Sequence, residues 1–221
     1  MAILEIKGDI IPNDDKWIYD WLGWESTCPA DVDKVSMTMQ PGEKLEVIIN
    51  SGGGSVFAGQ EIYSKLKRRD DVTIEIQSLA GSAAGVIAMA GKSKISPVGM
   101  IMIHNVSMSG ASGDYHDMQK NVEILKQMNA AMASAYTEKS GMTLEDVLKI
   151  MDRETWLTAN QCLEYGFVDE IMTEQQNFTN TVQGIRLTDE IRQQVLAEKE
   201  KQDKEETLKN ELLKDLDMYG V

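Results

Sequence analysis

Short apolar runs alternate with segments in which apolar residues recur every three or four positions, from residue 2 to about residue 174. Runs of the first kind are typical of buried strands, and the second spacing is typical of helices that cover a sheet. The expected strands are "AILEIKGDI", "KLEVIIN", "DVTIEIQSLA", the apolar end of "KISPVGMIMIHNV", and "FVDEI". Strands and helices in alternation predict an α/β fold with a largely parallel sheet.

The expected helices lie between these strands. They span residues 14–24, 56–69, 81–92 and 116–140, and two more begin after the capping residues Thr143 and Thr158. In the first helix Trp17 and Trp21, each followed by an aliphatic residue, recur at helical spacing, and we expect them to pack on the core. "KLEVIIN" runs into the glycines of "NSGGGSVFAG", which we expect to form a loop.

Residues 175–221 have a different character, since charged residues and good helix formers dominate there. Leu187, Ile191 and Val195 form one apolar stripe, but few apolar residues follow until Leu208. We therefore predict two parts, a domain over residues 1–174 and a charged, partly helical C-terminal tail over 175–221. Two roles for the tail stay open: it pairs with a partner, or it is a mobile segment with no role.

The composition excludes several classes of protein. With 221 residues, 42% of them apolar, the chain can bury a full core, and its formal charge of −14 disfavours nucleic acid and anionic membranes as partners. Cys28 and Cys162 lie too far apart for a metal or redox motif and indicate free thiols in a reducing compartment. "MAILEIKGDI" lacks the features of a signal peptide, and we expect a cytoplasmic protein without metal or cofactor.

Ser82 stands out in "EIQSLAGSAAGVIAMAG" because small residues surround this single hydroxyl between a strand and a helix. Two explanations are open. Small residues let a helix pack closely on a sheet, and they also make room for a substrate backbone beside a nucleophile. The free backbone N–H groups at the start of a helix would favour the second use.

Two further elements have the chemistry to work with a serine nucleophile. His104 ends the apolar strand "GMIMIHN", whereas His116 begins a polar helix and is expected to be solvated. The glycines of "INSGGGSVFAG", Gly53 among them, leave amide hydrogens open to a substrate. No Lys-Ser/Thr pair follows the glycines, so this loop is not a phosphate cradle of the Walker type.

Four motifs in order give a more specific indication: "IINSGGGSVFAGQEIY", "AGSAAGVIAMAG", "MIMIHN" and "ETWLTANQCLEYGFVDEI". With them, residues 2–174 resemble the ClpP serine peptidases, and within that family the ClpP-like head maturation proteases of phages and prophages. The resemblance implies a ClpP/crotonase-like spiral of ββα units. It also implies that Ser82 is the nucleophile, that His104 is the general base, and that the N–H groups of Gly54 and Ala83 form the oxyanion hole.

The sequence departs from the family pattern at two places. The acid of the triad, usually Asp, falls on Glu154 in "MDRETWLTA", and Asp152 is the alternative. Gly52 stands where the family's glycine-rich loop has a proline, which predicts a more mobile loop before substrate binds.

The resemblance also bears on partners. The family's ring-to-ring element corresponds to residues 106–139, which implies homo-oligomeric rings, and its Gly110 suits a flexible strand that binds extended peptide substrate. The Met and Ala face of its helix fits either a subunit contact or the core of the chain itself. This face consists of Met128, Ala131, Met132 and Ala135.

The chain starts almost directly at the first expected strand, which makes docking of an ATP-driven unfoldase doubtful. The acidic tail fits a phage assembly protease whose extension contacts scaffold or capsid protein. We therefore expect an ATP-independent serine endopeptidase that acts in prohead or capsid maturation.

Two alternatives from other classes remain. A crotonase-type acyl-CoA enzyme shares the spiral fold and a two-amide oxyanion hole, and "SVFAGQEI" resembles a stretch of that family. An inactive shell or scaffold relative of ClpP would explain the altered acid and the missing proline. The pair Ser82 and His104 favours the peptidase.

Overall fold

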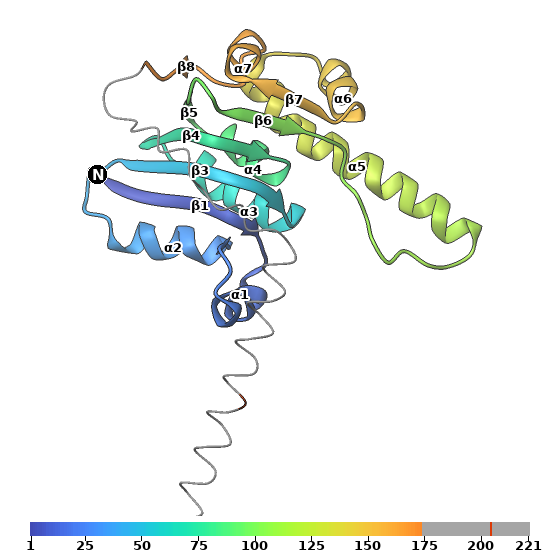
Figure 1. Cartoon of the computed structure of the whole chain (residues 1–221). Helices are drawn as coiled ribbons and strands as arrows, with labels where there is room; N and C mark the ends of the chain where they lie inside the picture. The colour runs from blue at the N-terminus through green and yellow to red at the C-terminus, as the bar shows by residue number, and fades with distance from the viewer. Residues whose placement is uncertain (174–203, 205–221) are drawn as a thin grey trace, which may run out of the picture. The chain divides into compact units, whose positions relative to one another are not determined.

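The computed structural model describes residues 1–173 and Lys204 (Figure 1). The division of the chain at residue 174 and the tail stay predictions, since the tail lies outside the described residues apart from Lys204. Within the described part, no helix combines the length and the apolar character that crossing a bilayer requires.

The described elements alternate between strands and helices along the chain. The strands are β1 (Ala2–Ile10), β2 (Ser26–Thr27), β3 (Leu45–Gly54), β4 (Val72–Gly81), β5 (Lys92–Ile95), β6 (Met100–Ile103), β7 (Thr155–Thr158) and β8 (Glu170–Ile171). The helices are the 3-10 turn η1 (Asn13–Asp15), α1 (Lys16–Leu22), α2 (Pro29–Thr38), α3 (Val56–Lys67), α4 (Ala83–Ala88), α5 (Tyr115–Ser140), α6 (Leu144–Asp152) and α7 (Ala159–Glu164).

The strands form one sheet in the order β2-β1-β3-β4-β5-β8, with every neighbouring pair parallel. The sheet forks at β4, whose first half pairs with β5 and whose last residues pair with β6. β7 is antiparallel to β6 and is the exception in direction. The predicted α/β class with a largely parallel sheet is confirmed.

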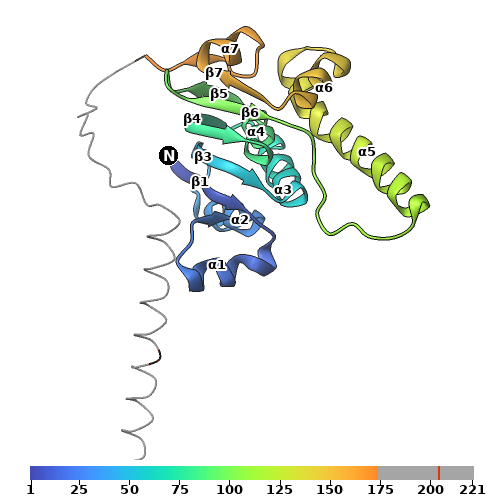
Figure 2. The same cartoon turned by 45° about the vertical axis from the view of Figure 1, so that its right-hand side comes forward.

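The core lies on the face of the sheet where α4 packs on β3 and β4, with α3 packed against α4 (Figure 2). Ile6, Ile49 and Ile76 stand side by side in three adjacent strands, and all three are fully buried. This register fixes where β3 and β4 end, and both strands end at the glycines and the serine that the sequence singled out.

The prediction that α1 packs its tryptophans on the core is wrong. Trp17 and Trp21 are 68% and 77% exposed. The polar side of this short helix is tied down instead, because Tyr19 donates a hydrogen bond to Asp9 and Lys16 donates to the Ser26 backbone. The indoles therefore point to solvent.

The glycines after "KLEVIIN" do not form a loop either. β3 continues to Gly54 and pairs with β1, Asp9 opposite Gly53 and Ile10 opposite Gly54, after a bulge. The extended pairing survives because glycine accepts the positive φ angles of 105° at Gly53 and 148° at Gly54.

The predicted caps of α5, α6 and α7 agree with the structure, but the helix expected over 81–92 is limited to α4, and Lys92 already belongs to β5. Thr143 accepts a hydrogen bond from the Asp146 N–H, and the Thr158 N–H donates to the Gln161 side chain. Gly141 ends α5 in the left-handed conformation. Four short elements, α2, β2, β5 and β7, were not predicted from the sequence pattern.

Asp169 connects β5 to α5. Its carboxylate accepts from the Ser93 N–H at 2.7 Å and pairs with Lys139. Burial alone would raise the pKa of Asp169, but these hydrogen bonds outweigh burial and hold the pKa below the ordinary 3.8.

We expect Asp169→Asn to lower the free energy of unfolding by about 1 kcal/mol at pH 7, a modest value because the pair is partly solvated. Because the pKa of Asp169 is lower in the folded state, its charged carboxylate stabilises the fold fully at pH values above the ordinary pKa. This contribution is lost as the pH falls through the folded-state pKa of Asp169. Urea unfolding should therefore show the deficit at pH 7 and a smaller one at about pH 2.5. An equal deficit at both pH values would contradict this account.

Candidate active site

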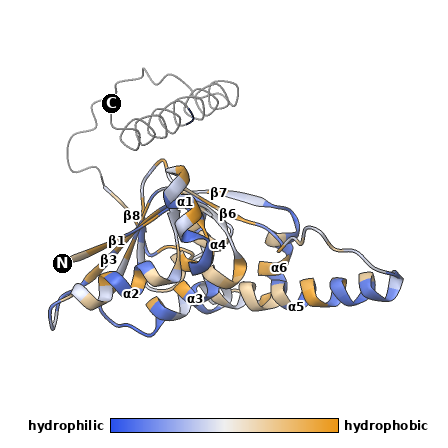
Figure 3. Ribbon diagram, turned by 90° about the horizontal axis from the view of Figure 1, so that it is seen from below, coloured by the Kyte–Doolittle hydropathy of each residue, from blue (hydrophilic) through white to orange (hydrophobic). Residues whose placement is uncertain are grey.

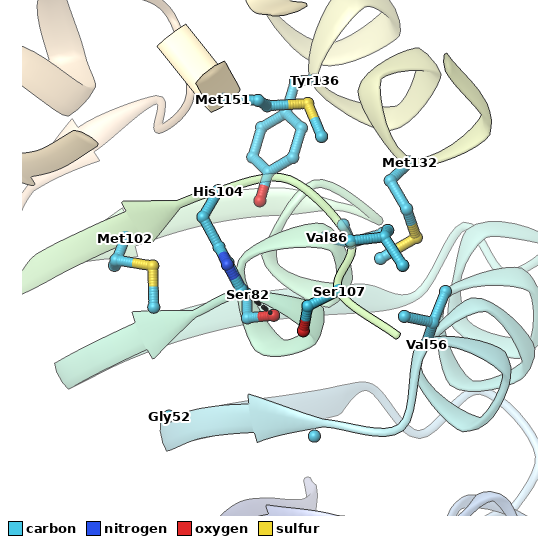
Figure 4. Close-up of a pocket in the computed structure, with 12 residues that line it drawn as sticks. Gly52, Val56, Ser82, Val86, Met102, His104, Ser107, Met132, Tyr136 and Met151 are labelled. Carbon is cyan, nitrogen blue, oxygen red and sulfur yellow. Dashed lines mark hydrogen bonds between the residues drawn. The ribbon is translucent and has the colours of Figure 1, made fainter. Parts of the chain in front are cut away.

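Ser82 and His104 meet at the fork in the sheet. His104 Nε2 lies 2.8 Å from Ser82 Oγ, within hydrogen-bond distance (Figure 4). Ser82 follows β4 and His104 follows β6, and these parallel strands pair Gly81 with Met102. Both side chains are half-buried. The sheet thus joins a hydroxyl and an imidazole that are 22 residues apart.

The backbone at Ser82 turns sharply from strand to helix. Its φ of 51° and ψ of −120° lie in a region that L-residues rarely adopt. Among the described residues, Glu154 is the other non-glycine residue with positive φ. Such strain concentrates at functional sites, and a strained strand-to-helix turn is how many hydrolases expose a serine hydroxyl.

Of the two explanations for the small residues around Ser82, the structure supports close packing, and room for a substrate stays a prediction. A Cβ at Gly85 would stand 2.5 Å from the Tyr136 hydroxyl, so this glycine permits close packing of α4. A Cβ at Gly53 would stand 2.7 Å from Ser82 Cβ and 3.0 Å from the Ala83 nitrogen. Gly53 therefore keeps space free beside the hydroxyl and the first amide of α4.

The two residues expected to form the oxyanion hole, Gly54 and Ala83, lie at the end of β3 and at the start of α4. Ala83 begins α4, so its N–H has no partner within the helix. Gly54 is exposed and lines the pocket next to Ser82. The Ser51 hydroxyl holds the strand end in place, since it accepts from the Gly53 N–H at 3.1 Å and donates to the Gly8 carbonyl at 2.6 Å.

The register between β6 and β7 indicates which acid candidate lies opposite His104 along the strands. β6 and β7 pair Met102 with Trp156 and Ile103 with Thr155, so the next pair beyond the ladder is His104 and Glu154. Glu154 is exposed, and its positive φ of 46° ends the strand there. Glu154 thus follows His104's neighbours in the register, and its role as the orienting acid stays a prediction.

Asp152 occupies a different position. Its Oδ1 accepts a hydrogen bond of 2.8 Å from the Asn105 side chain. The structure thus brings together the serine and the histidine, and neither acid candidate contacts the imidazole by a hydrogen bond in the described part of the chain.

A pocket of about 340 Å³ opens beside Ser82 and His104. Apolar side chains from α3, α4, α5 and α6 form its walls. They are Val56, Val86, Met132, Tyr136 and Met151. Burial in this wall raises the pKa of Tyr136, which keeps the phenol neutral. Most of these residues could not be singled out from the sequence, because they come from four different helices and none belongs to a motif.

Of the remaining candidates, Met132 alone lines the pocket described above. Gly110 is exposed, and residues 104–114 form no strand, so the peptide-binding strand expected there is not formed in this structure. On α5, Met132 and Ala135 are buried in the core, whereas Ala131 is exposed. His116 is exposed, as expected. Cys28 and Cys162 are buried free thiols.

Comparison with known proteins gives one consistent result. The family model described as Clp protease matches residues 35–175. The ATP-dependent Clp protease proteolytic subunit 2 of Tropheryma whipplei is 34% identical over 139 residues, which cover 61% of this chain and 76% of that protein.

Two further relatives agree with this match. The ATP-dependent Clp protease proteolytic subunit of Bacteroides fragilis is 32% identical over 61% of this chain and 67% of its own length. The ATP-dependent Clp protease proteolytic subunit 1 of Chlamydia muridarum is 31% identical over 60% of this chain and 71% of its own length.

Gly53 lies where a side chain would come too close to Ser82. Gly53→Ala should lower the midpoint of thermal unfolding and slow the reaction of Ser82 with a fluorophosphonate probe, since the new methyl group would overlap Ser82 and the Gly81 carbonyl. Gly52→Ala is the matched control for stability, because a Cβ there meets nothing within 4 Å. Equal stability and labelling of Gly53→Ala and the wild type would show that this close approach is unimportant.

Proposed function

This chain belongs to the Clp protease family, and on that premise we propose that it is a serine-type peptidase with Ser82 as its nucleophile. The observation that carries the proposal is the 2.8 Å contact between His104 Nε2 and the hydroxyl of Ser82, at a strained strand-to-helix turn. A phosphate-binding or purely structural turn would not need an imidazole at that distance.

The proposed reaction starts from the contact between Ser82 and His104. Ser82 Oγ attacks the carbonyl carbon of the peptide bond while His104 Nε2 takes its proton. The N–H groups of Gly54 and Ala83 stabilise the oxyanion, and Glu154 orients the imidazole through Nδ1. His104 then protonates the leaving amine, and water hydrolyses the acyl-enzyme by the same steps in reverse.

The pocket indicates which peptide bonds are cleaved. Its apolar walls and its volume of about 340 Å³ fit a large uncharged side chain. A charged side chain there would lose its hydration without finding a partner. We infer that the residue before the cleaved bond is apolar.

The projecting half of α5 supports assembly into homo-oligomeric rings. Tyr115, Met118 and Val122 are exposed there and follow the heptad spacing that continues to the buried Met132 and Tyr136. In Figure 3 apolar and polar residues alternate along this part of α5. A second subunit would cover the stripe where the chain's own core ends.

We further propose that the peptidase works without ATP and acts on phage capsid or scaffold proteins. Hydrolysis by a Ser-His pair needs no nucleotide, and the sequence from "ETWLTA" to "GFVDEI" with the acidic segment after residue 174 resembles phage assembly proteases. The Ser82–His104 contact favours a peptidase over a crotonase-type acyl-CoA enzyme.

Removal of either reacting group should abolish activity. We expect Ser82→Ala and His104→Ala to lower peptide cleavage at least about a thousandfold, with the fold intact. His116→Ala is the matched control, since the chain holds only these two histidines and His116 is exposed. Steady-state cleavage of an apolar fluorogenic peptide measures all three. A wild-type protein that neither cleaves nor reacts with a fluorophosphonate would instead be the inactive shell or scaffold relative.

The two acid candidates can be separated by isosteric changes. Glu154→Gln should lower kcat/KM about a hundredfold or more, because a neutral amide no longer stabilises the imidazolium. Asp152→Asn should keep a rate near that of the wild type, since it faces Asn105. The reverse order of the two effects would assign the role to Asp152.

Nucleotide dependence is tested with an unstructured protein such as casein. Cleavage should proceed without ATP or an added unfoldase, and the capsid and scaffold proteins of the same phage or prophage should be cut at defined sites. Cleavage that appears only with an unfoldase and ATP would overturn ATP independence, and intact capsid and scaffold proteins would overturn the proposed substrates.

A further inference from the structure

Trp156 is a large apolar residue whose position the fold does not require. It is 49% exposed in the short strand β7, which pairs with β6 alone. Its neighbours Thr155 and Leu157 point to the other face of the strand, and Leu157 is buried in the core. Packing therefore accounts for Leu157 and leaves much of the indole of Trp156 at the surface.

The register places this indole beside the candidate active site. Trp156 is directly opposite Met102 in the antiparallel pair, so both side chains share one face of the sheet with Cβ atoms about 5 Å apart. Met102 lines the pocket that contains Ser82 and His104. Trp156 thus extends the apolar surface of the site along the sheet.

Met102 and the apolar pocket walls flank the reacting pair on different sides. Figure 4 shows Met102 on one side of Ser82 and His104, and Val56, Val86 and Met132 on the other. A peptide whose carbonyl carbon lies at Ser82 Oγ therefore meets one apolar surface with the residue before the cleaved bond and another with the residue after it.

The direction of the peptide follows from the proton that His104 transfers. The leaving amine takes that proton, so the part of the substrate after the cleaved bond begins beside the imidazole. Met102 is two residues before His104 on the same face of β6, and Trp156 is opposite it. These two side chains border the leaving part of the substrate.

We propose that Met102 and Trp156 form a second subsite, which binds a large aliphatic or aromatic side chain of the residue directly after the cleaved bond. The inference rests on the proposed peptidase activity and adds a specificity determinant on the leaving-group side. Trp156 acts here by contact with substrate rather than in proton transfer.

The experiment compares two peptides with the same acyl part and either Leu or Gly after the cleaved bond, with products quantified by mass spectrometry. Trp156→Ala should lower the ratio of kcat/KM for Leu over Gly about tenfold, and Trp156→Phe should retain most of it. Trp17→Ala, which removes an exposed indole far along the chain, should leave the ratio unchanged. An unchanged ratio in Trp156→Ala would overturn the proposal, even if both rates fell because subunits no longer assemble.

A binding measurement separates this inference from the proposed function. In Ser82→Ala protein with Trp17, Trp21 and Trp24 changed to Phe, Trp156 is the remaining tryptophan. Addition of the uncleaved Leu peptide should shift its fluorescence emission, and the Gly peptide should shift it less. Equal or absent shifts, in a protein whose wild type cleaves both peptides, would remove the subsite while the peptidase stands. A wild type that cleaves neither peptide would remove the peptidase, and the inference with it.

Discussion

The hydrogen bond from the Ser82 N–H to the Met102 carbonyl, 2.8 Å long, holds the two halves of the candidate site together. It is the last link between β4 and β6, made just where β4 turns into α4. Because the imidazole of His104 lies two residues beyond Met102, this bond determines how far the base stands from the hydroxyl. A shift of one residue in this pairing would place Ile103 on that face in place of His104.

The fork in the sheet makes this arrangement possible. β5 pairs with the first half of β4 and ends, which leaves the last residues of β4 free to pair with β6. The cost is crowding at the junction, where the ends of β3, β4 and α4 meet. Gly53, Gly81 and Gly59 each take a place in which a Cβ would approach a neighbouring atom within 3 Å. The site therefore depends on residues without side chains as much as on the two that react.

Much of this could be predicted from the sequence. Ser82 and His104 stand out because a hydroxyl among small residues and an imidazole at a strand end are local signals, and the helix caps at Thr143 and Gly141 are equally local. The pocket walls were not predictable in the same way, since Val86, Met132 and Met151 look like ordinary core residues until the helices that hold them converge.

The exposed tryptophans of α1 show where prediction from helical spacing fails. Helical spacing predicts which residues share a face but not whether that face meets the core. In α1 the hydrogen bonds of Tyr19 and Lys16 hold the opposite face against the rest of the protein. The sequence leaves the acid open between Glu154 and Asp152 for a related reason. The register β6–β7 is a property of the fold, and only this register places Glu154 opposite His104.

The most direct test is a crystal structure of the protein after reaction with an apolar peptide boronic acid. The account predicts a tetrahedral boron bound to Ser82 Oγ, with one boronate oxygen about 3 Å from the backbone nitrogens of Gly54 and Ala83. A boronate bound elsewhere, or one attached to Ser82 with both oxygens turned away from those amides, would contradict it.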